Sequence, residues 1–265
     1  MTTAVAIHEQ GQETGRSPFL SHSQLNRYVV CPEQYRLHYI EQYRARFPAG
    51  GLVFGQALHQ ALAGLFGNGL DPVPIFRDVW ASIRDLDLSY SRKDSWDKLA
   101  QAGEALLRGF LEEAAPRITN VAAVERRFEL RVTGLPLPLV GYIDLVADLD
   151  GTRTVIDFKT ATSGQDGHEV TLSDQLTAYL LAEPEAKQAA HCVLVRTREP
   201  RVEWHVTKRD PQGFTEFLSK VAHVADEMAQ ARFYKRAGLW CSWCDFLPVC
   251  VGDRATVEET LIRIR

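Results

Sequence analysis

The sequence has 265 residues, of which 45% are hydrophobic and 24% are charged, and its formal net charge is −4. This composition is typical of a globular protein, and no apolar run approaches the roughly 20 residues that a membrane-spanning helix needs. The small negative charge argues against a protein that coats nucleic acid, although a local basic face can still bind it. Residues 1–18 lack the basic start and apolar core of a secretory signal, so we expect a polar N-terminal arm there and a cytoplasmic protein without membrane partners.

The first half of the chain is expected to be mainly helical. Two short helices are predicted within residues 21–43, because Ser21 or Ser23 can cap the first and Pro32 suits the first turn of the second. This places Cys31 at the joint between them. Apolar periodicity predicts further helices over 51–66, 71–86 and 95–115.

The hydrophobic period then changes from helical to alternating. Residues 121–132 alternate as a half-buried strand does, and two more strands are predicted over 139–149 and 152–159. Asp150-Gly151 between them is a strong signal for a two-residue hairpin turn. A helix over 171–185, strands over 189–197 and 201–208 and a helix over 211–233 follow. This order predicts an α/β fold with a central mixed sheet and helices on its faces.

The hairpin carries the most informative polar residues. A two-residue turn places Asp144 directly opposite Asp157 on one face, and Lys159 lies two residues further along that face. Two carboxylates this close repel each other unless a cation lies between them, and a divalent metal beside a lysine suits phosphodiester hydrolysis. The alternative is that both aspartates face solvent and Lys159 pairs with one of them. A longer turn would change the register.

At this point the chain resembles a known family. "GYIDLV" followed by "VIDFKT" resembles the core of the PD-(D/E)XK nucleases, and more narrowly their RecB-like exonuclease branch, which includes CRISPR adaptation exonucleases and AddB-type repair subunits. Four further segments match this branch in order: "CPEQYRLHY", "GQALHQAL", "DQLTAYLLA" and "CSWCDFLPVC". The resemblance implies a restriction-endonuclease-like core in a single nuclease domain over 19–252, followed by a tail over 253–265.

The resemblance also implies roles for individual residues. The ligands of a catalytic Mn²⁺ or Mg²⁺ would be His59, Asp144, Asp157 and the backbone carbonyl of Phe158. A histidine among oxygen ligands shifts preference toward manganese. Lys159 would activate the attacking water, and Gln175 and Tyr179 would face the site. Glu125 resembles an auxiliary acid of some members. The family often has glutamate where this chain has Asp157, and its pattern allows either.

Three of the five cysteines crowd into one short segment: Cys241, Cys244 and Cys250. Three thiolates leave a tetrahedral metal or a cluster one ligand short, and the spacing alone does not separate zinc from iron–sulfur. The resemblance supplies Cys31 as the fourth ligand and implies a [4Fe–4S] cluster, which would join the N-terminal and C-terminal segments.

The sequence also predicts roles for the aromatic residues near the three clustered cysteines and for the fifth cysteine. Trp240, Trp243 and Phe246 are expected to shield the cluster from water. Cys192 lies in an apolar strand, where we expect it to be a buried spectator.

Together these features predict a metal-dependent DNA exonuclease with a structural cluster. It would act on single-stranded DNA ends or the ends of a duplex, in repair and recombination or in CRISPR spacer acquisition, with other proteins of those systems as partners. The competing hypothesis is a catalytically silent DNA-binding or assembly module that retains the cluster. The intact set of Asp144, Asp157 and Lys159 argues against that alternative.

Overall fold

The computed structural model describes residues 18–164 and 167–264. The expected N-terminal arm over 1–18 therefore lies almost wholly outside the described residues. The described chain forms two compact units. The terminal unit comprises 18–47, 129–140 and 218–264, and the sheet unit comprises the described residues of 48–128 and 141–217. The single domain over 19–252 stays a prediction.

The helices agree in type and order with those expected, and the structure adds short ones. The α-helices are α1 (His22–Val30), α2 (Pro32–Tyr35), α3 (Gly50–Asn68), α4 (Pro72–Ser82), α5 (Trp96–Gly109), α6 (Gly167–Thr171), α7 (Asp174–Ala182), α8 (Pro211–Ala229), α9 (Leu247–Val251) and α10 (Arg254–Thr260). Short 3-10 and π segments are η1 (Arg36–Ile40), η2 (Phe110–Ala114), η3 (Ala115–Arg117) and η4 (Leu239–Trp243). No helix among the described residues has both the length and the apolarity to cross a bilayer.

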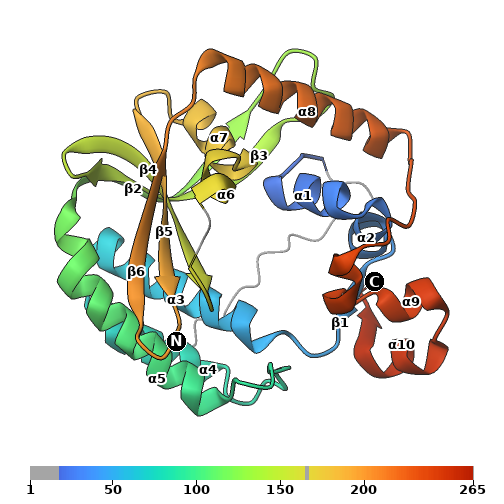
Figure 1. The fold of residues 1–265 in the computed structure, drawn as a ribbon, viewed down its shortest axis with the longest axis horizontal. Helices are drawn as coiled ribbons and strands as arrows, with labels where there is room; N and C mark the ends of the chain where they lie inside the picture. The colour runs from blue at the N-terminus through green and yellow to red at the C-terminus, as the bar shows by residue number, and fades with distance from the viewer. Residues whose placement is uncertain (1–17, 165–166, 265) are drawn as a thin grey trace. The chain divides into compact units, whose positions relative to one another are not determined.

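The strands form one large sheet and one small one. They are β1 (Tyr43–Ala45), β2 (Ile118–Leu130), β3 (Leu139–Leu149), β4 (Thr152–Ala161), β5 (Gln188–Val195), β6 (Arg201–Thr207) and β7 (Leu261–Arg263). The large sheet has the order β2-β3-β4-β5-β6 (Figure 1). β4 runs parallel to β5, whereas β3–β4 and β5–β6 are antiparallel. The fold class is confirmed: a central mixed sheet in an α/β protein, flanked by helices.

The register of the central hairpin is the one that the sequence predicts. Leu149 pairs with Thr152 and Leu145 pairs with Ile156. Asp150 and Gly151 both have positive φ, 49° and 78°, as a tight two-residue hairpin turn requires. Asp144 and Asp157 lie opposite each other, one step beyond the Leu145–Ile156 pair in this register.

Helices cover both faces of the large sheet. Successive residues of a strand point to opposite faces. Phe158 of β4 stacks on Phe66 of α3, with ring centroids 6.1 Å apart, whereas its neighbour Asp157 accepts a hydrogen bond from Gln175 of α7. α3 and α7 therefore lie on opposite faces, and residues 154–158 in the middle of β4 are buried.

The terminal unit brings the two ends of the described chain together. β1 pairs antiparallel with β7, and Leu37, Phe246 and Leu261 form a small buried core. Within the segment expected as a tail over 253–265, the described residues contain α10 and β7. Asp253 caps α10 by accepting from the Thr256 backbone N–H, and Leu261 is only 4% exposed.

Two glycines of α5 allow a matched test of packing in the sheet unit. A Cβ on Gly103 would lie 2.1 Å from Cζ of Phe76, whereas a Cβ on Gly109 would meet nothing within 4 Å. The Phe76 ring is 1% exposed and packs on Phe54 and Trp80, so it has little room to move. We predict that Gly103→Ala lowers the free energy of unfolding by about 1–3 kcal/mol.

Gly109→Ala serves as the control, since it should raise the free energy of unfolding by about 0.5–1 kcal/mol through helix propensity alone. Urea denaturation of both variants measures the difference. Equal effects of the two substitutions would contradict the packing of Phe76 on Gly103.

Candidate active site

The candidate site lies where β3 and β4 stop pairing with each other. The residue pairs between β3 and β4 end at Leu145–Ile156, whereas β4 continues to pair with β5 as far as Ala161–Val195. Beyond that point the carboxylate of Asp144 accepts the backbone N–H of Phe158, with Oδ2 at 2.8 Å. A side-chain acceptor thus satisfies a strand donor, and the parting of the strands leaves space for other groups.

A histidine and a second acid converge on Asp144. His59 of α3 places Nδ1 3.5 Å from Asp144 Oδ2. Glu125 of β2 joins them: one ligand atom from each of His59, Glu125 and Asp144 lies within 4.8 Å of the other two. Among the described residues, this is the group of histidine, cysteine and acidic side chains whose spacing fits a metal ion.

The backbone of Glu125 explains how its side chain reaches the site. Its φ is 48°, a left-handed conformation that costs a residue other than glycine about 1–3 kcal/mol. It interrupts the regular alternation of β2 and re-aims the side chain. The sequence alone left the orientation of Glu125 undetermined because period-two alternation does not show such an interruption.

Burial and nearby charges shift the pKa values of the groups of this site. Burial raises the pKa of Asp144 well above its ordinary value, and the nearby charge of Asp157 adds to the effect. Burial, assisted by Asp157, likewise raises the pKa of Glu125. Burial lowers the pKa of His59, which keeps the imidazole neutral at physiological pH. A neutral imidazole is the form that binds metals.

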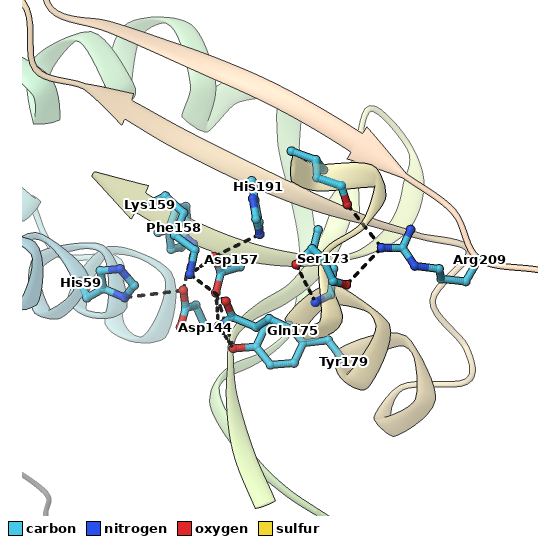
Figure 2. Close-up of polar contacts among 12 residues, drawn as sticks. His59, Asp144, Asp157, Phe158, Lys159, Ser173, Gln175, Tyr179, His191 and Arg209 are labelled. Carbon is cyan, nitrogen blue, oxygen red and sulfur yellow. Dashed lines mark hydrogen bonds and ion pairs between the residues drawn. The ribbon is translucent and has the colours of Figure 1, made fainter. Parts of the chain in front are cut away.

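Asp157 is held by a network on the other side of the site (Figure 2). Its Oδ2 lies 2.8 Å from Nζ of Lys159, and its Oδ1 accepts from Nε2 of Gln175 at 2.8 Å. Gln175 also accepts from Lys159 through Oε1 at 2.8 Å and contacts the Tyr179 hydroxyl at 2.8 Å. The network therefore fixes the positions of Lys159 and Asp157 relative to each other.

The exposure of these side chains shows which side of the site is open. Asp157 is 1% exposed, so the alternative in which it faces solvent is wrong, although Lys159 does pair with it. The side chains of His59 and Lys159 remain 32% and 37% exposed. A substrate can therefore reach the site beside His59 and Lys159, while Asp157 forms its floor.

One neighbour of the site was missed from the sequence. His191 of β5 pairs in register with Asp157 across the parallel β4–β5 ladder, and its Nε2 lies 3.7 Å from Asp157 Oδ2. Only the parallel register, which the sequence did not provide, brings this residue to the site.

The four cysteines assigned to the cluster all lie in the terminal unit. Cys31 occupies the joint between α1 and α2, as predicted. Its Sγ lies 3.5 Å from the backbone N–H of Arg236, and Sγ of Cys244 accepts from Nε2 of Gln34 at 3.2 Å. Burial raises the pKa of Cys250, and the nearby Lys235 opposes that rise. No three of these thiols, all within the described residues, have their sulfur atoms within 4.8 Å of one another.

The aromatic residues near the cysteines differ in exposure. Phe246 is 3% exposed and packs in the core of the terminal unit. Trp243, the last residue of η4, is 74% exposed, so the expectation that it shields the thiols from water is wrong. Cys192 is fully buried, as expected, and burial raises the pKa of its thiol.

Comparisons with known proteins agree with this fold. The chain is similar in structure to a Eubacterium rectale protein named as a candidate exonuclease, with a TM-score of 0.50, 12% identity and coverage of 81% of this chain and 80% of that one. It is also similar to SSO0001, with a TM-score of 0.38, 17% identity and coverage of 74% and 84%. At 12% identity the first similarity shows the fold alone. The TM-score of the second is too low to show a shared fold.

The family comparison covers nearly the whole chain. No curated protein matches the sequence. A model of the PD-(D/E)XK nuclease superfamily matches residues 19–251, and the mixed sheet with its flanking helices is consistent with the restriction-endonuclease-like core of that superfamily. The chain belongs to the PD-(D/E)XK nuclease superfamily.

Proposed function

We propose that this nuclease is a metal-dependent deoxyribonuclease that hydrolyses phosphodiester bonds from DNA ends, and that Asp144, Asp157 and Lys159 are at the centre of its active site. One observation carries the proposal: a buried carboxylate (Asp157) and a half-buried one (Asp144) adjoin at the parting of β3 and β4, with a lysine 2.8 Å from the first and a histidine 3.5 Å from the second.

The residues present fit a divalent cation. His59, Glu125 and Asp144 offer ligand atoms within 4.8 Å of one another. Asp157 Oδ2 is buried and accepts no hydrogen bond of good geometry from the described residues, despite the short approach of Lys159, so it retains lone pairs for a cation. We propose His59, Asp144, Asp157 and the Phe158 carbonyl as the ligands, with Glu125 as an additional one. Oxygen ligands with one imidazole suit Mn²⁺ or Mg²⁺.

Each side chain then has a chemical task. A bound divalent cation supplies Lewis acidity toward the phosphodiester. Lys159 lies beside Asp157 and is partly exposed, so its ammonium group can orient the attacking water or hold a phosphate oxygen. Gln175 and Tyr179 hold Lys159 and Asp157 in place. The alternative of a catalytically silent module does not account for this complete network.

The finer features of the activity rest on the resemblance described above. We propose action on single-stranded ends, or on the ends of a duplex, in DNA repair and recombination or in CRISPR spacer acquisition, with proteins of those systems as partners in the cytoplasm. The similar Eubacterium rectale protein is named as a candidate exonuclease, which agrees with attack from ends.

We further propose that Cys31, Cys241, Cys244 and Cys250 hold a [4Fe–4S] cluster. Two sulfur atoms already have N–H donors, from Gln34 and from the backbone of Arg236, and such donors stabilise thiolates bound to a cluster. Four thiolates around one zinc ion would lie about 3.8 Å apart, because the Zn–S distance is about 2.3 Å and the site is tetrahedral. In the described residues no three of these thiols have their sulfur atoms within 4.8 Å of one another. A cubane cluster separates its thiolates further because each binds a different iron.

Activity measurements test the active-site assignment. Asp157→Asn and Lys159→Ala should each lower kcat on end-labelled single-stranded DNA with Mn²⁺ by at least about 100-fold. Asp148→Asn is the matched control, since Asp148 lies on the same hairpin but pairs with Arg153; it should change kcat by less than about threefold. Wild-type rates in the Asp157 variant would refute the assignment, and cleavage of circular single strands would refute attack from ends.

The raised pKa of Asp144, which burial causes and the nearby Asp157 increases, predicts an unusual stability effect. Because the folded-state pKa of Asp144 is raised, its ionisation destabilises the folded protein; this cost develops as pH rises from the unfolded to the folded pKa and is fully present above both. Asp144→Asn should therefore raise the free energy of unfolding of the metal-free protein at pH 8 by about 1–3 kcal/mol, with the difference vanishing near pH 4.

Added Mn²⁺ should reverse this order. It should raise the Tm of the wild type and have little effect on Asp144→Asn, because binding stabilises only a protein that retains the site. Thermal unfolding with and without Mn²⁺ measures both effects. A metal-free Asp144→Asn protein that is less stable than the wild type at pH 8 would contradict the destabilising ionisation of Asp144.

Metal analysis tests the cluster. Protein purified without oxygen should be brown and contain about four irons per chain. Cys241→Ser should lose the iron, whereas Cys192→Ser, which removes the buried fifth cysteine, should keep it. A colourless wild-type protein that contains zinc and no iron would exclude the cluster.

A further inference from the structure

We infer that Arg209 is a positioning residue for the active site, which acts by fixing the N-terminal turn of α7 and, through that turn, Gln175. This inference rests on the proposed function, since it assigns a role in the same catalytic network. Arg209 lies between β6 and α8 in the sequence and does not touch the reacting groups itself.

The contacts of Arg209 converge on the start of α7 (Figure 2). Its Nε donates to Oγ1 of Thr177 at 2.7 Å, and its Nη2 donates to the carbonyl oxygens of Ser173 at 3.1 Å and Val170 at 3.3 Å. Its Nη1 donates to Oγ1 of Thr207 at 2.7 Å. One guanidinium therefore joins α6, the cap of α7, the first turn of α7 and the end of β6.

These partners are the residues that define where α7 begins. Ser173 is the N-cap of α7, and its hydroxyl accepts the backbone N–H of Leu176. The carbonyl oxygen of Ser173 accepts the N–H of Thr177. Gln175 lies within this turn, so any shift of the turn moves the amide that bonds Lys159 and Asp157.

The hydrogen bonds of Gln175 need precise positioning, which explains why the rigid, planar guanidinium of an arginine suits position 209. The Gln175 amide spans two partners, each 2.8 Å away, and a displacement of about 1 Å is enough to reduce catalysis about 100-fold. Arginine presents its donors in one rigid plane, whereas lysine has a single rotatable ammonium group. Lysine would keep the charge and lose the simultaneous contacts.

A double-mutant cycle tests the inference. Arg209→Lys should lower kcat on single-stranded DNA about tenfold and leave KM within about twofold. In a Gln175→Ala background the same substitution should change kcat by less than about twofold, because the two residues act through one path. Arg77→Lys is the matched control: Arg77 makes an arginine fork to Glu104, between α4 and α5, and its loss should leave kcat unchanged in both backgrounds.

Multiplicative effects of Arg209→Lys and Gln175→Ala on kcat would overturn the inference, and so would an effect of Arg209→Lys confined to KM. If Arg209→Lys does not fold, Thr177→Val, which removes one acceptor, should lower kcat in the same direction by a smaller factor and again only when Gln175 is present.

Hydrogen exchange separates this inference from the proposed function. If the wild type cleaves no DNA, the proposed function fails, but the role of Arg209 can still be measured. Arg209→Lys should accelerate exchange of the Leu176 and Thr177 amides at least about tenfold, whereas Arg77→Lys should not. Unchanged exchange of these two amides in Arg209→Lys would overturn the inference without reference to activity.

Discussion

Repulsion between carboxylates at the parting of β3 and β4 is the constraint around which the sheet unit is built. Asp144 and Asp157 are brought together by the hairpin register, and Glu125 adds a third acid beside them. A folded chain tolerates such a group only if donors and cations offset the charge. The backbone N–H of Phe158 does so for Asp144, and Lys159 with Gln175 does so for Asp157.

The donors and cations around the carboxylates offset their charge only in part. The pKa of Asp144 and that of Glu125 both remain raised, and Glu125 adopts a left-handed backbone conformation that brings its carboxylate into the group. In a protein under selection for stability alone, a substitution at Asp144 and another at Glu125 would relieve these costs. Costs of this kind are common where a site must bind a ligand or catalyse a reaction. A divalent cation is the ligand that would convert the repulsion into binding energy.

The elements around the carboxylates hold them from opposite faces of the sheet. α3 supplies His59 from one face, and α7 supplies Gln175 and Tyr179 from the other. The start of α7 is in turn tied by Arg209 to the end of β6. The geometry of two side chains on one hairpin thus depends on segments that are more than one hundred residues apart in the sequence.

The sequence predicted those parts of the site that local rules determine. The Asp150-Gly151 turn defined the register, and the register brought Asp144 opposite Asp157. Patterning also predicted that Cys31 lies at a helix joint. What it missed depends on long-range packing: the parallel pairing that places His191 beside Asp157, the irregular backbone of Glu125, and the reach of Arg209. The folded segment after residue 253 was missed because its apolar residues are few and one of them, Leu261, packs against Leu37 near the other end of the chain.

Diffraction from crystals soaked in Mn²⁺, measured at the manganese absorption edge, tests the central claim most directly. We predict an anomalous peak in contact with His59, Asp144 and Asp157, with oxygen distances of about 2.1–2.3 Å, and loss of that peak in Asp144→Asn crystals. A site between these side chains that holds no manganese under saturating conditions, or a peak that persists unchanged in the variant, would contradict the account.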